Sequence, residues 1–324
     1  MDRRSFIKKG LIFTGAAALS TSPWPAPSIL RAAENRKVKL KIGYLPITDH
    51  MLIMAASLGK FQHAEIEPVK FSSWPDISEA IKAGAIDGAF LLTPIGITLY
   101  KKGIPLQAVM LGHRNGSVIT VKVGKSIKKT GDLRGKTIAI PSPFSTHNIL
   151  LRKILLENKI PVSSVRIIDM APPEMPVALA TGRIDGYIVA EPFGAQAEFM
   201  NVGEILMLSR DIWKDHICCV LNINESVIKN HPESVRELVG GMVNTAGFIK
   251  NNPKKASEKS VDFLGQKPSV VEHVLTKPKG RLTFDHLKPE ISDFEATQNY
   301  MVEFGIADRK VSLKNYVSTD FFEG

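Results

Sequence analysis

The stretch AIKAGAIDG at residues 80–88 returns as ALATGRIDG at residues 178–186, and in each copy five further residues lead to a proline, Pro94 or Pro192. Each copy is typical of a helix that ends at a glycine and leads into a buried strand. The offset of 178 − 80 = 98 residues is longer than the repeat unit of a solenoid. The repeat therefore predicts two similar α/β lobes.

The residues around each copy extend the same pattern. Apolar, β-branched segments at 39–45 and 136–140 each lead into a helical segment, and a second strand follows. The expected helices lie at 49–58 and 146–158, and the second strands at 66–71 and 165–169. Such alternation predicts right-handed crossovers and mostly parallel sheets, which bind ligands beyond the carboxyl ends of their strands.

Two more strand-like segments, 117–123 and 216–222, flank the second lobe and are predicted to be hinge strands. We expect lobe 1 to contain residues 34–123 and 217–324, and lobe 2 to contain residues 124–216. A helical tail is expected to pack back on lobe 1, and the protein is expected to be a monomer. The helices predicted in the tail are 226–229, 232–250, 253–264, 269–276 and 289–304.

The first 33 residues form a separate segment with the features of an export signal. Basic residues precede the apolar run Gly10–Leu19, which is too short to cross a membrane, and small residues and prolines follow. Asp2–Lys8 looks like a twin-arginine signal, with cleavage expected near Ala32 or Ala33. A cytosolic basic tail is the alternative. The export signal predicts a periplasmic protein.

The charge balance argues against nucleic acid as a partner. The chain has 42 Lys+Arg and 32 Asp+Glu, of which the first 33 residues hold five and one, leaving 37 − 31 = +6. The basic residues are scattered in short pairs without interleaved aromatic residues, which is typical of a solvated surface. A mild positive field weakly favours an anionic solute.

Three motifs carry a resemblance to a known family: GYLPITD at 43–49, PSPFSTHN at 141–148 and DGYIVAEPF at 185–193. They resemble the periplasmic solute-binding proteins of nitrate, bicarbonate, alkanesulfonate and taurine ABC importers. The resemblance implies a type II periplasmic binding protein fold and a non-enzymatic protein without cofactor. It also implies capture of a small, anionic solute between the lobes, and delivery to an ABC permease and ATPase.

One segment departs from the nitrate and bicarbonate branch. Members of that branch carry Trp and Gln in the loop after the first Asp-Gly, whereas this chain has AFLLTP at 89–94. The departure favours a larger or partly apolar solute over nitrate or bicarbonate.

The expected binding residues lie at strand ends and at the starts of helices, where loops of both lobes would meet. The predicted ligand-binding residues are Thr48, Asp49, His50, Trp74, Thr93, Arg114, Phe144, Ser145, Thr146, His147 and Glu191. Amides and hydroxyls at facing helix starts would grip an anion, and Arg114 would hold a carboxylate or sulfonate in bidentate fashion.

Structural roles remain open for several of these residues. Thr48 and Asp49 are also typical helix N-caps, and packing in a core is the alternative role of Trp74 and Phe144. His147 is either a ligand or a satisfied structural histidine. Glu191 would repel an anion, so pairing with Arg114 or a lysine, contact with a cationic group of the ligand, or a role in the hinge are its alternatives.

Two other classes of protein remain as alternatives. The same fold class includes thiamine-pyrimidine synthases and menaquinone-pathway enzymes, and Cys218 and Cys219 suggest a reactive site. Both cysteines, however, lie in an apolar strand-like run, where thiols are usually inert. The eight histidines show no metal-ligand spacing, so no catalytic or metal site is predicted. An extracytoplasmic sensor module is the third interpretation.

Overall fold

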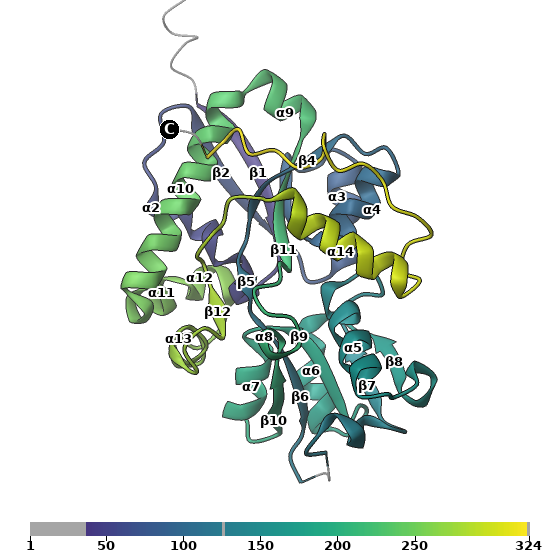
Figure 1. The fold of residues 1–324 in the computed structure, drawn as a ribbon. Helices are drawn as coiled ribbons and strands as arrows, with labels where there is room; N and C mark the ends of the chain where they lie inside the picture. The colour runs from purple at the N-terminus through teal and green to yellow at the C-terminus, as the bar shows by residue number, and fades with distance from the viewer. Residues whose placement is uncertain (1–36, 125–126, 323–324) are drawn as a thin grey trace, which may run out of the picture. The chain divides into compact units, whose positions relative to one another are not determined.

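Two five-stranded mixed sheets form the framework of the computed structural model, which describes residues 37–124 and 127–322 (Figure 1). From Lys37 onward the chain forms one compact unit. The predicted export signal, residues 1–33, lies outside the described residues.

The first sheet has the order β2-β1-β3-β11-β4, in which β1 runs parallel to β2 and β3, and β11 runs antiparallel to β3 and β4. Its strands are β1 (Val38–Tyr44), β2 (Ala64–Lys70), β3 (Gly88–Leu92), β4 (Leu106–Leu111) and β11 (Cys219–Asn224). Every residue of β3 is buried, as expected for a central strand covered on both faces.

The second sheet has the order β10-β6-β9-β7-β8 and the same sense of pairing, with β7 parallel to β8 and β9, and β6 antiparallel to β9 and β10. Its strands are β6 (Ser117–Lys122), β7 (Thr137–Ile140), β8 (Arg166–Asp169), β9 (Gly186–Ala190) and β10 (Gly203–Leu208). Both sheets thus contain a parallel trio, and one antiparallel strand beside it.

The sequence repeat occupies equivalent places in the two sheets. Helices α3 (Trp74–Lys82) and α6 (Met175–Ala180) end before Gly84 and Gly182, whose φ angles are +67° and +75°, and the strands β3 and β9 follow. These positive φ values are the left-handed conformation in which a glycine ends a helix without strain.

The repeated aspartates also have equivalent surroundings. The Asp87 carboxylate accepts from the Lys41 N–H at 2.7 Å, and the Asp185 carboxylate accepts from the Thr137 N–H at 2.9 Å. Lys41 directly precedes Ile42, where β1 begins to pair with β3. Thr137 directly precedes Ile138, where β7 begins to pair with β9. The prediction of two similar lobes is confirmed at the level of individual hydrogen bonds.

Helices connect and cover the strands as the alternating pattern predicts. The segment expected to be helical at 49–58 is the 3-10 helix η1 (Thr48–Met54) followed by one α-turn, α2 (Ala55–Leu58). The other connecting helices are α4 (Thr93–Lys101), α5 (Thr146–Glu157), α7 (Phe193–Phe199) and α8 (Ser209–Ile212), with the short 3-10 turns η2 (Thr130–Leu133), η3 (Val162–Ser164) and η4 (Pro172–Glu174).

The carboxyl-terminal tail is helical and packs mainly against the first sheet, where α10 contacts β2, η1 and α2, and α14 contacts α4 (Figure 1). Two of its helices also reach the second set of elements, since α13 contacts α7 and α14 contacts α5. The tail contains α9 (Glu225–Asn230), α10 (Pro232–Asn251), α11 (Pro253–Lys259), α12 (Val261–Leu264), α13 (Pro268–Thr276) and α14 (Ile291–Glu303), and the short strand β12 (Leu282–Thr283), which pairs with β5 (Arg114–Asn115).

The two predicted hinge strands each pair within one sheet. β6 belongs to the second sheet and β11 to the first, so the chain changes sheet in the residues just before each strand. The expected boundary at residue 123 assigns β6 to lobe 1, whereas β6 pairs within the second sheet.

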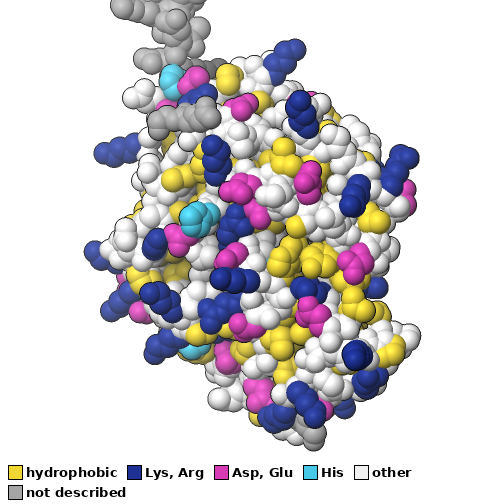
Figure 2. Space-filling view, in the orientation of Figure 1, with side chains coloured by type: hydrophobic (Ala, Val, Ile, Leu, Met, Phe, Trp, Pro, Cys, Tyr) yellow, Lys and Arg dark blue, Asp and Glu magenta, His cyan; other side chains and the backbone are white. Residues whose placement is uncertain are grey.

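No helix among the described residues combines the length and the apolar character needed to span a membrane. On the face shown in Figure 2, Lys and Arg side chains are interspersed with Asp and Glu side chains. This mixture of signs agrees with the solvated surface expected from the sequence.

Candidate functional site

Backbone and side-chain hydrogen bonds connect the two sheets next to the candidate site. Thr48, at the start of η1, donates to the Glu191 carbonyl both from its amide (2.8 Å) and from its hydroxyl (2.9 Å). Glu191 directly follows β9 of the second sheet. Because both donor groups of Thr48 are occupied, Thr48 connects the lobes and has no free donor to offer a ligand.

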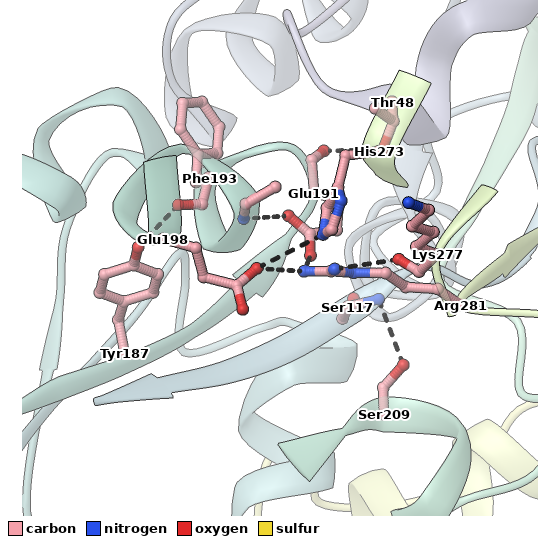
Figure 3. A network of polar contacts seen from close by, with 11 residues as sticks. Thr48, Ser117, Tyr187, Glu191, Phe193, Glu198, Ser209, His273, Lys277 and Arg281 are labelled. Carbon is pink, nitrogen blue, oxygen red and sulfur yellow. Dashed lines mark hydrogen bonds and ion pairs between the residues drawn. The ribbon is translucent and has the colours of Figure 1, made fainter. Parts of the chain in front are cut away.

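Glu191 itself is held by the carboxyl-terminal segment. Figure 3 shows Arg281 lying between the carboxylates of Glu191 and Glu198, and its guanidinium contacts both. The Glu191 carboxylate also accepts from the Ala195 N–H at 3.0 Å. Burial raises the pKa of Glu191 against the effect of Arg281. Of the alternatives that the sequence left open, pairing with a cation at the junction of the lobes is the one this geometry supports, although the partner is an arginine that was not predicted.

The centre of the site is a group of buried acidic, imidazole and thiol side chains. One ligand atom from each of Asp49, His113, Cys218 and Cys219 lies within 4.8 Å of all the others. Asp49 comes from η1, His113 follows β4, and the cysteines lie at the start of β11. All four residues are inaccessible to solvent, and the two cysteines are free thiols.

Asp49 and His113 form an ion contact. The Asp49 Oδ2 and His113 Nε2 atoms are 3.0 Å apart, but their alignment does not make a hydrogen bond. Burial raises the pKa of Asp49 to about 6, whereas His113 opposes that rise. Burial alone would lower the pKa of His113, but the adjacent Asp49 carboxylate outweighs it and raises the pKa to about 10. At neutral pH the pair is therefore an imidazolium beside a carboxylate.

Cys218 and Cys219 differ in their electrostatic surroundings. Burial would raise the pKa of the Cys218 thiol, but hydrogen bonding to Cys219 and the neighbouring His147 and His113 imidazoles lower it well below its usual range. Burial and the neighbouring Cys218 raise the pKa of Cys219. The Cys218 carbonyl accepts from both the amide (2.8 Å) and the hydroxyl (3.0 Å) of Thr93, which fixes the backbone at this point.

His50 has a defined tautomer. Its Nδ1 accepts from the Leu45 N–H at 2.9 Å, so the ring proton is on Nε2. The ring stacks on Phe90 at 5.0 Å and meets Trp74 edge-on at 5.9 Å. Burial lowers the pKa of His50 to about 3, so the ring is neutral, and its buried Nε2–H has no hydrogen-bond partner among the described residues.

The second lobe contributes His147 and Thr146 from the first turn of α5. His147 Nε2 is 2.9 Å from the Ser117 hydroxyl and 4.0 Å from the Cys218 sulfur, which places this helix beside the cysteine cluster. His147 Nδ1 and Thr146 Oγ1 are buried without a hydrogen-bond partner among the described residues. Ser145, another predicted ligand residue, accepts from the Asn148 N–H at 3.0 Å as the helix N-cap.

The site therefore concentrates buried polar atoms that lack partners in the described part of the chain. They belong to both lobes: Asp49, His50, Trp74, His113, Thr146 and His147. A buried polar group without a partner costs about 1–3 kcal/mol, and native proteins contain few such groups. Other described residues with such atoms are Asn115, Thr120, Gln196, His216 and Arg281. The group around Asp49 and His113 is the candidate site because it combines such atoms with the two cysteines.

Two predicted residues lie away from this centre. The Arg114 guanidinium contacts the Asp293 carboxylate of α14 at 2.7 Å and donates to the Asp215 carbonyl at 2.9 Å. It therefore pairs with a carboxylate of this chain. Phe144 is 42% exposed and lies with Trp74 and Ser142 at a surface pocket of about 210 Å³. Trp74 thus contacts His50 on one side and reaches this pocket on the other.

A larger hollow of about 570 Å³ opens between α2 and α10, lined by Phe61, Gly241 and Phe248 among others. Its acidic residue, Glu237, already accepts three backbone N–H groups, from Gln62, His63 and Ala64. The buried cluster, rather than this hollow, has the unsatisfied polar chemistry of a binding site.

Sequence reasoning missed His113, Cys218, Cys219 and Ser117 as members of the site. These residues come from three separate segments, and only the pairing of β11 with β3 and β4 brings the segments together. The sequence offers one signal, the adjacent cysteines, although their apolar surroundings favour inert core thiols.

Comparison with solved structures identifies the fold as that of the periplasmic binding proteins. One similar structure is the ligand-binding component of an ABC-type import system from Staphylococcus aureus, solved with zinc bound. It is 28% identical with a TM-score of 0.80, and the match covers 89% of this chain and 98% of the Staphylococcus chain. The nitrate-binding protein NrtA of Synechocystis PCC 6803 has a TM-score of 0.79 at 17% identity, covering 89% and 88%. The fold also extends to the desulfurization enzyme DszB (TM-score 0.66, 13% identity, covering 88% and 97%).

The chain belongs to the NMT1-like family, whose sequence profile matches residues 33–264. Among curated relatives, the nitrate/nitrite binding protein NrtA of a Nostoc species is 27% identical over 252 residues, 70% of this chain. The nitrate import ATP-binding protein NrtC of a Synechocystis species is 29% identical over 250 residues, also 70% of this chain. The chain spans 57% and 37% of the length of these two relatives.

Proposed function

We propose that the protein is the exported solute-binding component of an ABC importer, which captures a small solute in the buried cluster between the two sheets and delivers it to a permease and ATPase. The observation that carries the proposal is the set of partnerless buried polar atoms to which both lobes contribute. A structural core would satisfy these groups internally, whereas a binding protein completes them with its solute.

The curated relatives support this class of function. Their names describe a nitrate/nitrite binding protein and a nitrate import ATP-binding protein. Part of the second relative aligns with this chain, which is consistent with a solute-binding module associated with an importer ATPase. Small anions and sulfonates are accordingly the first solutes to test.

Thermal unfolding tests the proposal directly. The full chain is heated with nitrate, nitrite, cyanate, bicarbonate or an alkanesulfonate, and a solute that binds only the folded protein raises the melting temperature by mass action. Thr146→Val with His147→Gln should abolish the shift produced by the hit, because these side chains bring the second lobe's free polar atoms to the site. Thr276→Val, in which an exposed hydroxyl bonded to the Glu272 carbonyl is lost, is the matched control.

An enzyme on this fold is the alternative, since DszB shares the architecture. The two functions differ in one measurement. A binding protein leaves its solute chemically unchanged after prolonged incubation. Conversion of the solute by the full chain would show that the protein is an enzyme.

A further inference from the structure

The four-residue cluster has the donor types of a transition-metal site. Asp49 offers a carboxylate oxygen, His113 an imidazole nitrogen, and Cys218 and Cys219 offer two sulfurs. Calcium and magnesium prefer sites made of oxygen atoms. Sulfur and imidazole nitrogen together favour zinc and related borderline metals.

The distances also suit one ion. With zinc–ligand bonds of about 2.0–2.3 Å, neighbouring ligand atoms of a tetrahedral site are roughly 3.3–3.8 Å apart. The Asp49 Oδ2 and His113 Nε2 atoms are 3.0 Å apart, and the largest separation in the cluster is within 4.8 Å. Contraction by about 1 Å would therefore close the four donors around a single ion.

A second observation is independent of the donor types. Both carboxylate oxygens of Asp49 and both ring nitrogens of His113 lack a hydrogen-bond partner among the described residues, although both side chains are fully buried. The single contact between Asp49 Oδ2 and His113 Nε2 leaves Asp49 Oδ1 and His113 Nδ1 uncompensated, which costs free energy in a buried site. A cation bound by the carboxylate and the imidazole would remove that cost.

The backbone around the cluster is firmly held. Thr93 donates twice to the Cys218 carbonyl, and the Gly112 amide donates to the Cys219 carbonyl at 2.8 Å. Gly116 lies against the other two ligands: a Cβ at that position would be 2.7 Å from Asp49 Oδ1 and 3.0 Å from His113 Nδ1. Rigid support of this kind is what a metal site requires of its surroundings.

We propose that Asp49, His113, Cys218 and Cys219 bind one divalent metal ion of the zinc class. This inference rests on the proposed function because it takes the same buried cluster as the binding site. His147 of the second lobe, 4.0 Å from the Cys218 sulfur, lies next to the ion. Metal binding displaces the protons of the ligands that carry them, and those protons pass to solvent.

Titration of the full chain with Zn²⁺ alone tests the proposal, under a reductant that keeps both thiols free. We expect one ion per chain by elemental analysis after dialysis, and proton release measured by calorimetry in buffers of different ionisation enthalpy. Millimolar Mg²⁺ or Ca²⁺ should not compete. With Co²⁺ as the probe, a sulfur-to-cobalt charge-transfer band should appear in the near ultraviolet.

The variants Cys218→Ser and Asp49→Asn should each weaken Zn²⁺ binding by about 100-fold or more, and the first should also weaken the cobalt band. His63→Ala, which removes an exposed imidazole, is the control and should bind as the parent does. Circular dichroism checks that each variant is folded. If Cys218→Ser does not fold, Cys219→Ser is the second thiol variant.

The outcomes separate this proposal from the general function. If Zn²⁺ binds only weakly, or binds the variants and the parent with the same affinity, the metal site is refuted. A small anion that still raises the melting temperature in that case preserves solute capture. If neither metal nor anion binds, both proposals fail.

Discussion

Gly116 shows how a single residue decides whether the buried cluster can form. Its φ of +85° is favourable only for glycine, and its Cα faces the Asp49 carboxylate and the His113 ring. A side chain at this position would strain the backbone and displace both of these groups. We therefore assign Gly116 two roles, one in the turn and one in the site.

Replacing Gly116 with alanine should lower the free energy of unfolding by about 1–3 kcal/mol and abolish ligand-induced stabilisation. Gly103→Ala is the matched control, because Gly103 has a φ of +83° but open space where the Cβ would lie. Denaturant unfolding measures the loss of stability in both variants. The loss at Gly103 reports backbone strain alone, and any additional loss at Gly116 reports steric crowding. Equal losses in both would show that crowding at Gly116 contributes nothing.

The site residues divide into those that sequence could indicate and those that it could not. Asp49, His50, Thr146 and His147 follow strands of the repeat, so their position at strand ends predicted that they would meet. His113 and the two cysteines belong to the strands that leave and re-enter the first sheet, where no repeat marks them. Their proximity depends on the antiparallel pairing of β11, which sequence periodicity does not specify.

At the scale of elements, hydrophobic periodicity and glycine positions predicted the first strands and helices of each lobe, the repeated helix and strand, and the helical tail. They did not predict β4, β10, α4, α7 or α8. The expected helix at 49–58 begins as the 3-10 helix η1, in which every residue from Thr48 to Met54 is buried. An amphipathic pattern cannot describe a segment that has no exposed face.

Helix α10 is fastened to the first sheet by Glu237. Its carboxylate accepts the N–H groups of Gln62, His63 and Ala64 at 2.8, 2.8 and 3.0 Å, just before β2. Burial would raise the pKa of Glu237, but these three donors outweigh it and lower the pKa below 4.5. The carboxylate thus stabilises the folded state above pH 4.5, and this contribution is lost as the pH falls through the folded pKa.

Glu237→Gln should cost about 1 kcal/mol at pH 7, and the difference from the parent should shrink on acidification below pH 4.5. Urea unfolding at pH 7 and pH 3.5 measures both values. Glu233→Gln, on the exposed first turn of the same helix, should change stability by less than about 0.5 kcal/mol at either pH. A pH-independent loss at Glu237 would contradict the role of its charge.

At the scale of the whole molecule, Arg281 and Glu191 connect the carboxyl-terminal segment to the second sheet. Both side chains are almost inaccessible to solvent, with 2% and 0% exposure. Removal of one partner from a buried pair leaves the other charge uncompensated, which costs about 3–5 kcal/mol. Exposed pairs are worth about 1 kcal/mol or less.

Arg281→Met should therefore destabilise the protein strongly, and addition of Glu191→Gln should recover part of the loss. A double-mutant cycle by denaturant unfolding measures the coupling between the two residues. Lys128→Ala breaks the exposed contact with Glu204 at 2.6 Å and should have little effect. Strict additivity of the Arg281 and Glu191 changes would show that the pair does not join these segments.

The complete enclosure of Asp49, His113 and Cys218 has a kinetic consequence. A solute bound at this cluster could leave only after the surrounding side chains move apart, so the opening rate would set the upper limit of its escape rate. A scavenger in the surrounding water would then not accelerate unloading at any concentration. A membrane partner that favours the open state would control the timing of release.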